Sequence, residues 1–200
     1  MKGKSFVSAV MIAMGMMVLG SGMCIAEMKF IVNANPLAFL ISPDADEFSA
    51  STTFVREEID GNTSWMPTLL GGVEFDTESV VYAVTAGGGY LYNDAFRTPL
   101  VQGDVAVRFK IWNMEIGPHV GALYFIDPEW EGTATLVLDE SLGVLGGISL
   151  TTTGEHFRFF VSADYVNGEF DVTGSGSWVP NKNEIDYSGF LGQVGVIFRF

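Results

Sequence analysis

Two histidines are the only side chains of this chain whose ordinary pKa lies near neutral pH, so they are the first candidates for acid–base chemistry. His119 follows Glu115 by four residues, and in an extended strand that spacing places both side chains on the same face. An imidazole beside a carboxylate could act as a general base, or it could be one member of a structural charge network. His156 lies in a short polar segment, where we expect it to be solvated. For His119 we expect the charge network.

Other charged residues recur at even spacing inside otherwise apolar segments. Asp104, Arg108 and Lys110 share one face of a segment, and Arg158 and Asp164 share one face of another. The side chains that this pattern places in a common interior are Glu74, Asp104, Arg108, Lys110, Glu115, His119, Arg158, Asp164 and Arg199. Apart from the histidine they are four acids and four bases, and charges removed from water are tolerated when they are paired. A neutral, paired interior predicts a polar plug rather than an open pore.

The segments that carry these charges alternate between apolar and polar residues with a period of two, which is typical of β-strands with one apolar face. In the segment 100–112, Val105 and Phe109 lie on one side, and Arg108 and Lys110 lie on the other. Similar segments are 28–41, 68–75, 80–92, 115–126, 142–150, 157–165 and 188–200. Eight such strands can close into a barrel whose interior is just wide enough for side chains to fill.

Three prolines argue against regular strands at their positions. Proline cannot donate a hydrogen bond to a ladder, and a closed barrel has no free edge to accommodate it. Pro36, Pro67 and Pro118 therefore each need a bulge or a position near a rim.

The first 26 residues have the pattern of a secretory signal peptide. Lys2 and Lys4 precede an apolar run from 6 to 19, and small residues lead to an expected cleavage site after Ala26. An uncleaved membrane anchor is an alternative, but the apolar run is short for a helix that spans a bilayer. A lipoprotein site at Cys24 is another, but Met23 stands where a small residue would be needed. We expect one domain, 27–200, which contains no cysteine for a disulfide or a thiolate site.

The expected mature chain is strongly acidic. Losing two lysines from ten basic residues leaves eight against 24 acids, a net charge of −16. Such a surface disfavours nucleic acid and repels anionic headgroups unless divalent cations intervene. The acidic excess belongs to loops and rims, above all to the segment with Asp44, Asp46, Glu47, Glu57, Glu58 and Asp60. That segment could bind Ca²⁺ or Mg²⁺ or be merely solvated, and it lacks the fixed spacing of a dedicated calcium loop.

The last strand ends in a specific pattern: Gln193, Gly195, Phe198 and Phe200 match polar-x-Gly-x-x-apolar-x-aromatic at the C-terminus. This resembles the sorting signal that the barrel-assembly machinery reads in bacterial outer-membrane β-barrel proteins. The chain from 27 to 200 resembles, in pattern only, the small barrels of the OmpA and OmpX type. The resemblance implies an all-β, antiparallel up-and-down transmembrane barrel of eight strands in the outer membrane of a Gram-negative type of cell envelope. It also implies contact with outer-membrane lipid and lipopolysaccharide, and no cofactor.

Connections between the segments alternate in length. Short ones lie at 76–78, around 113 and at 152–155, and long ones at 42–64, 93–98, 127–135 and 167–186. Outer-membrane barrels have short periplasmic turns and longer external loops, so we expect both termini in the periplasm. Aromatic residues expected near the two ends fit two interfacial girdles: Tyr90, Tyr92, Tyr124 and Tyr165, and Phe75, Phe157, Phe198 and Phe200.

Three classes of function remain open at this level. The first is a structural or surface-interaction protein that works through acidic external loops. The second is a narrow conduit for small or hydrophobic solutes, resembling the OmpW type. The third is a lipid-modifying enzyme, since some small barrels are lipid A deacylases or palmitoyltransferases. Gly121 and Arg158 stand where the deacylase pattern His-x-Ser would place a serine, so we assign no catalytic residue, and no metal ligand.

Overall fold

A computed structural model describes residues 26–59 and 62–200, and the expected signal peptide lies almost wholly outside them. The described chain is nearly all β-structure, with one short 3-10 helix, η2 (Ala45–Glu47). Within these ranges no helix has the length and apolarity needed to cross a bilayer.

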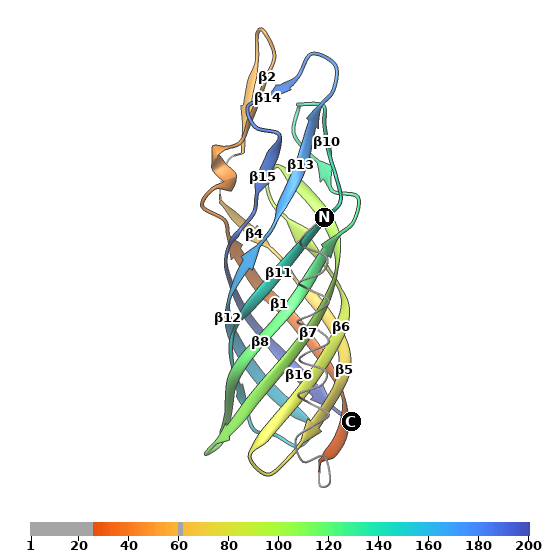
Figure 1. The fold of residues 1–200 in the computed structure, drawn as a ribbon, viewed down its shortest axis with the longest axis vertical. Coiled ribbons are helices and arrows are strands. Elements are labelled where there is room, and N and C mark those ends of the chain that lie inside the picture. Colours follow the sequence, from red (N-terminus) through yellow and green to blue (C-terminus); the bar gives the residue numbers. More distant parts are fainter. Residues whose placement is uncertain (1–25, 60–61) are drawn as a thin grey trace, which may run out of the picture.

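Eight long antiparallel strands close into a barrel, which confirms the expected fold class and strand number (Figure 1). They are β1 (Glu27–Ile41), β5 (Thr68–Asp76), β6 (Val80–Tyr92), β7 (Phe96–Ile111), β8 (Met114–Phe125), β11 (Ser141–Thr152), β12 (Phe157–Asn167) and β16 (Gly189–Arg199). Each pairs with the next along the chain, and β16 pairs with β1 to complete the ring. Because no edge is left open, all strands can satisfy their backbone groups in a bilayer.

The outer wall is apolar over the length of the strands. In β16, Phe190, Val194 and Phe198 face outward and are 40–67% exposed, whereas Leu191 and Arg199 face inward and are almost fully buried. The other barrel strands repeat this alternation. An apolar band around a closed barrel is the surface that a lipid bilayer requires.

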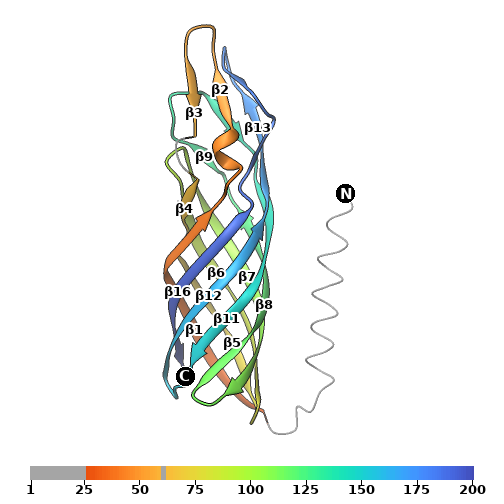
Figure 2. The same cartoon turned by 90° about the vertical axis from the view of Figure 1, so that its left-hand side faces the viewer.

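The three short turns and the C-terminus lie at one end of the barrel, and the long connections lie at the other (Figure 2). One expectation was wrong. The segment 93–98 is not a long loop, because β6 ends at Tyr92 and β7 already begins at Phe96. Only residues 93–95 lie between the two strands. Thr98 is fully buried and donates to the Ile126 carbonyl at 3.0 Å, so the strand pattern extends four residues earlier than the sequence indicated.

Above the barrel the remaining connections form β-structure of their own. One small sheet has the order β14 (Val179–Pro180), β2 (Ser49–Ser51), β3 (Arg56–Glu58). A second has the order β10 (Leu136–Leu138), β13 (Glu169–Gly174), β15 (Glu184–Asp186). Two shorter strands, β4 (Thr63–Trp65) and β9 (Glu129–Trp130), extend the barrel wall against β1, β6 and β7.

The three prolines are accommodated in three ways. Pro36 lies in a bulge of β1, where Ala34 pairs with Val196 but Leu37 already pairs with Val194. Pro67 lies in the gap between β4 and β5. Pro118 needs neither a bulge nor a rim. The β7–β8 pairing is interrupted opposite it and resumes without a change of register.

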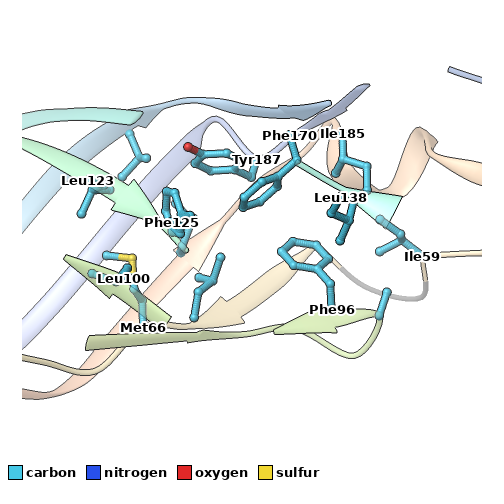
Figure 3. Packing of buried hydrophobic residues seen from close by; sticks show 14 of the residues in the cluster. Ile59, Met66, Phe96, Leu100, Leu123, Phe125, Leu138, Phe170, Ile185 and Tyr187 are labelled. Atoms are coloured by element: carbon cyan, nitrogen blue, oxygen red, sulfur yellow. The ribbon is translucent and has the colours of Figure 1, made fainter. Parts of the chain in front are cut away.

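The main hydrophobic core lies where the upper barrel meets the long connections (Figure 3). Phe125 packs edge-to-face against Phe170, at 5.3 Å between ring centroids, and against Tyr187, at 4.9 Å. Phe96 packs on the other side of Phe170 at 5.4 Å. We call this set, which also takes Leu residues from six barrel strands and Phe48 from the first connection, the hydrophobic cluster. It corrects the expectation of a polar lumen, because the upper interior is filled with apolar side chains.

Candidate functional site in the barrel interior

Seven charged side chains from five strands form an ion-pair network at the short-turn end, which we call the lower ionic cluster. Its members are Glu74, Asp76, Arg108, Lys110, Glu115, Arg158 and Arg199. Glu74 is the centre: its fully buried carboxylate accepts a hydrogen bond from Arg108, and Arg199 Nε lies 2.8 Å from its Oε2. Arg158 Nη1 lies 3.7 Å from Glu74 Oε1. Three guanidinium groups thus surround one carboxylate.

The other two acids complete the network. Arg158 Nη1 donates to Glu115 Oε2 at 2.8 Å, and Arg199 Nη2 donates to Asp76 Oδ2 at 2.7 Å. Lys110 Nζ forms an ion pair with the other oxygen of Asp76, Oδ1. Because the partners come from different strands, each pair links positions that the backbone ladders do not join. The network therefore closes the lower end of the lumen with paired charges.

Sequence reasoning missed Asp76, which it placed in the turn after the strand. The side chain instead ends β5 on the inward face. With Asp76 the lower ionic cluster has three acids and four bases, so the expected balance of charge does not hold within this layer. The parity of the strand carried the missing signal, since Asp76 is two residues beyond Glu74.

The remaining predicted interior residues lie higher, in what we call the middle polar layer: Asp104, His119 and Asp164. His119 Nε2 lies 2.7 Å from Asp164 Oδ1, and Gln193 donates to Asp164 Oδ2 at 2.8 Å. Gln102 donates to Asp104 Oδ2. The structure therefore brings His119 to Asp164, and not to Glu115, which belongs to the lower ionic cluster.

A cavity of about 70 Å³ lies beside the middle polar layer. Its wall includes Asn33, Asn35, Gln102, Asp104 and His119. Sites for metabolite-sized ligands typically measure roughly 300–1,000 Å³, whereas a single water needs only about 10–15 Å³ of such volume. The cavity therefore has room for a few water molecules or an ion.

The middle polar layer has no arrangement typical of nucleophilic catalysis. Ser162, the hydroxyl that bonds to the layer, donates to Asp164 Oδ2 at 2.8 Å rather than to His119. In the described ranges there is no group of three or more His, Cys, Asp or Glu side chains placed to hold a metal ion. His156 lies in the turn before β12, and its carbonyl accepts a hydrogen bond from the Arg199 amide at 2.9 Å.

The residues of the C-terminal pattern have roles in the folded barrel as well. The side chain of Gln193 joins Asp164 to Asn35, which donates to its Oε1 at 3.1 Å. A Cβ at Gly195 would lie 2.6 Å from the Phe160 ring and 2.4 Å from a β1 carbonyl, so a larger residue does not fit there. Phe198 packs on Phe157 on the outer wall, with 5.6 Å between the ring centroids. Phe200, two residues further along the chain, is 76% exposed.

Acidic residues of the first long connection link it to the other long connections above the barrel. Glu57 accepts hydrogen bonds from the Thr133 amide, at 2.8 Å, and from the Ala134 amide. Glu47 pairs with Lys182 at 2.6 Å. Asp60 and the side chain of Asp46 lie outside the described part of the chain. The connections therefore form a linked cap rather than independent loops.

The closed eight-stranded barrel, its apolar outer wall and its charge-paired interior define a small outer-membrane β-barrel protein. The chain is accordingly a protein of the cell outer membrane.

No protein-family model matches the chain, and a search of curated proteins finds no match. Among solved structures it is similar to the outer membrane protein OprG from Pseudomonas aeruginosa, with a TM-score of 0.49 and 11% identity over 86% of this chain and 96% of that one. It is also similar to Neisserial surface protein A (NspA), with a TM-score of 0.48 and 14% identity over 86% of this chain and 97% of that one.

Proposed function

We propose that this protein is a structural and surface-interaction component of the outer membrane, with a plugged lumen and a rigid acidic cap. The observation that carries the proposal is the closure of the interior at two levels. The lower ionic cluster fills the short-turn end, and the hydrophobic cluster fills the upper end with side chains from both wall and cap. An ion crossing the barrel would have to break paired buried charges and then enter an apolar core.

The cap supplies the surface for interaction. Its outward acids include Asp44, Glu58, Asp139, Glu140, Glu169, Asp171 and Glu184, all exposed. Lipopolysaccharide, the lipid expected around this part of the barrel, is itself anionic. Divalent cations between cap carboxylates and lipid phosphates would remove the repulsion. We therefore propose lipopolysaccharide bridged by divalent cations as one partner, and the barrel-assembly machinery as the partner of the C-terminal strand.

Conductance of the purified barrel in a planar lipid bilayer tests the plug. We expect no steady current through the wild type. A Phe125→Ala, Phe170→Ala double variant removes two central rings of the hydrophobic cluster but leaves the lower ionic cluster in place, so it should also stay closed. An open porin in the same bilayer shows that the assay can detect a pore. Steady ohmic current through the wild type would overturn the plug and support a narrow conduit.

Lipid A from cells that express the protein provides a check on the absence of catalysis. We expect its mass spectrum to be the same with the wild type, with His119→Ala and without the protein. A shift in mass that needs His119 would assign a lipid-modifying activity in place of the proposed role.

A further inference from the structure

The cavity beside the middle polar layer is lined by more unpartnered hydrogen-bond acceptors than donors, with four oxygens against two nitrogens, Arg108 Nε and His119 Nδ1. Asn33 Oδ1, Asn35 Oδ1, Gln102 Oε1 and Asp104 Oδ1 are buried oxygens that accept no hydrogen bond from any residue the structure describes. Gln102 is 2% exposed and Asn35 is 4% exposed. Buried polar atoms without partners are rare in folded proteins, and four around one cavity indicate an occupant that the protein atoms do not supply.

The amide orientations are fixed, so rotation of the side chains does not remove the excess. The amide nitrogen of Gln102 donates to Asp104, and that of Asn35 donates to Thr68 Oγ1 at 2.8 Å and to Gln193. Exchanging nitrogen and oxygen in either amide would break these bonds. The free oxygens of both amides are therefore acceptors in the folded barrel.

The strands leave room for the two carboxylates of this layer. Asp104 pairs with Gly121 across β7 and β8, and a Cβ at Gly121 would lie 2.1 Å from Asp104 Oδ1. Asp164 pairs with Gly147 across β12 and β11, and a Cβ there would also lie 2.1 Å from a carboxylate oxygen. Any other residue at either glycine would displace a carboxylate from its present position.

Charge identifies the kind of occupant. Asp164 has His119 as its partner, but Asp104 forms no ion pair within the described ranges and has only the neutral Gln102 amide as a donor. Arg108 also lines the cavity, but its Nη2 donates to Glu74 and its Nη1 donates to Thr151, so its charge is compensated in the lower ionic cluster. A carboxylate removed from water is stable when a positive charge compensates it. Carboxylate and amide oxygens are the ligands of hard cations, with water completing the shell.

We propose that this cavity binds an inorganic cation of the Na⁺ or Ca²⁺ type, held by the carboxylate of Asp104, by the amide oxygens of Gln102 and Asn35, and by water. This goes beyond the plug, because it gives the lumen a specific ligand. The hydrophobic cluster lies above the site and the lower ionic cluster lies below it.

NMR of the imidazole groups tests the proposal in the full mature chain, refolded in micelles at constant pH with choline chloride, NaCl or CaCl₂ at equal ionic strength. The chain has two histidines, so each spectrum contains one reporter in the cavity wall, His119, and one outside it, His156. We expect the His119 resonances to change with Na⁺ or Ca²⁺ and to saturate, while those of His156 stay constant. Parallel changes at both, or no change at either, would show that the cavity holds only water and would overturn the proposal.

Matched variants separate the cavity from the acidic cap. Asp104→Asn should weaken cation binding by about tenfold or more, because a charged ligand contributes more than a neutral one. Asp139→Asn makes the same chemical change at an exposed cap position and should leave the His119 titration unchanged. If Asp104→Asn does not fold, Gln102→Leu removes one ligand oxygen and should also weaken binding. Unchanged affinity in the folded cavity variant would refute the assignment.

Discussion

Glu74→Gln is the substitution that most directly tests how the lower ionic cluster stabilises the barrel. The carboxylate is fully buried and faces three guanidinium groups, of Arg108, Arg158 and Arg199. The cluster already has four bases against three acids, so losing this charge leaves an excess of two positive charges, and the three guanidinium groups that face Glu74 are only 3–4% exposed. Removing one member of a buried ion pair typically costs about 3–5 kcal/mol, whereas removing both partners costs much less.

Urea unfolding in lipid vesicles, followed by tryptophan fluorescence and by the gel shift of the folded barrel, measures this loss. With a denaturant slope of roughly 2 kcal/mol per M, the expected destabilisation lowers the urea midpoint by about 1.5–2.5 M. Glu78→Gln, four residues along the chain and exposed in the turn, is the matched control and should have almost no effect. Adding Arg199→Met to Glu74→Gln should restore part of the stability. Equal midpoints for Glu74→Gln and Glu78→Gln, or a double variant no better than the single, would refute the reasoning.

Four further outcomes are expected. Chymotrypsin added to intact cells should cut after Phe54, which is 94% exposed at the tip between β2 and β3, whereas cleavage confined to the short turns would reverse the assigned orientation. Deleting Phe200 or making Phe198→Asp should strongly reduce barrel assembly, because a charge on the lipid-facing wall costs up to about 2–4 kcal/mol and the sorting pattern is lost; normal heat-modifiable barrel in the outer membrane would contradict this. Lys182→Ala should be nearly neutral in urea, since its ion pair is exposed, and a loss comparable to that of Glu74→Gln would contradict the layered account of stability. Burial raises the pKa of the Tyr187 phenol, so the folded state favours the neutral form and stability should fall as the pH rises above about 10. In melting curves recorded across that pH range, the Tyr187→Phe variant should lose less stability than the wild type.

The fold could be predicted because apolar and polar residues alternate along the sequence of a strand that has lipid on one side and the barrel interior on the other. In β7 the sequence alone indicates which face meets lipid and which meets the interior, because Val105 and Phe109 lie on one side and Arg108 lies on the other. Even the bulge at Pro36 followed from the missing amide of proline. Pro118 did not follow, because a ladder can lose a pair locally without a shift of register, and only the neighbouring strand shows this.

The interior could be predicted only in part. Its layers depend on which inward-facing residues of different strands lie at the same height along the barrel axis, and that is set by the strand register. The period of two places Asp104 and Glu115 on inward faces, but their vertical separation comes from the register of β7 against β8. The hydrophobic cluster was missed for a related reason. Leu91 and Leu123 stand on faces that carry polar residues lower down, and nothing in the sequence order shows that they meet Phe170 from a distant connection.

The joining of cap and upper barrel in one core limits where the exposed part of this protein can vary. Substitution, or insertion of a short peptide, should be tolerated at the hairpin tips, such as residues 52–55 and residues 175–177, where Gly176 adopts a left-handed backbone. At the base of the same connections, Phe48 and Phe170 pack against the barrel wall, so substitutions there affect the stability of the membrane-spanning domain as well as the loop. Sequence change on this surface should therefore be confined to a few short tips, and the connections beneath them should change as slowly as the barrel itself.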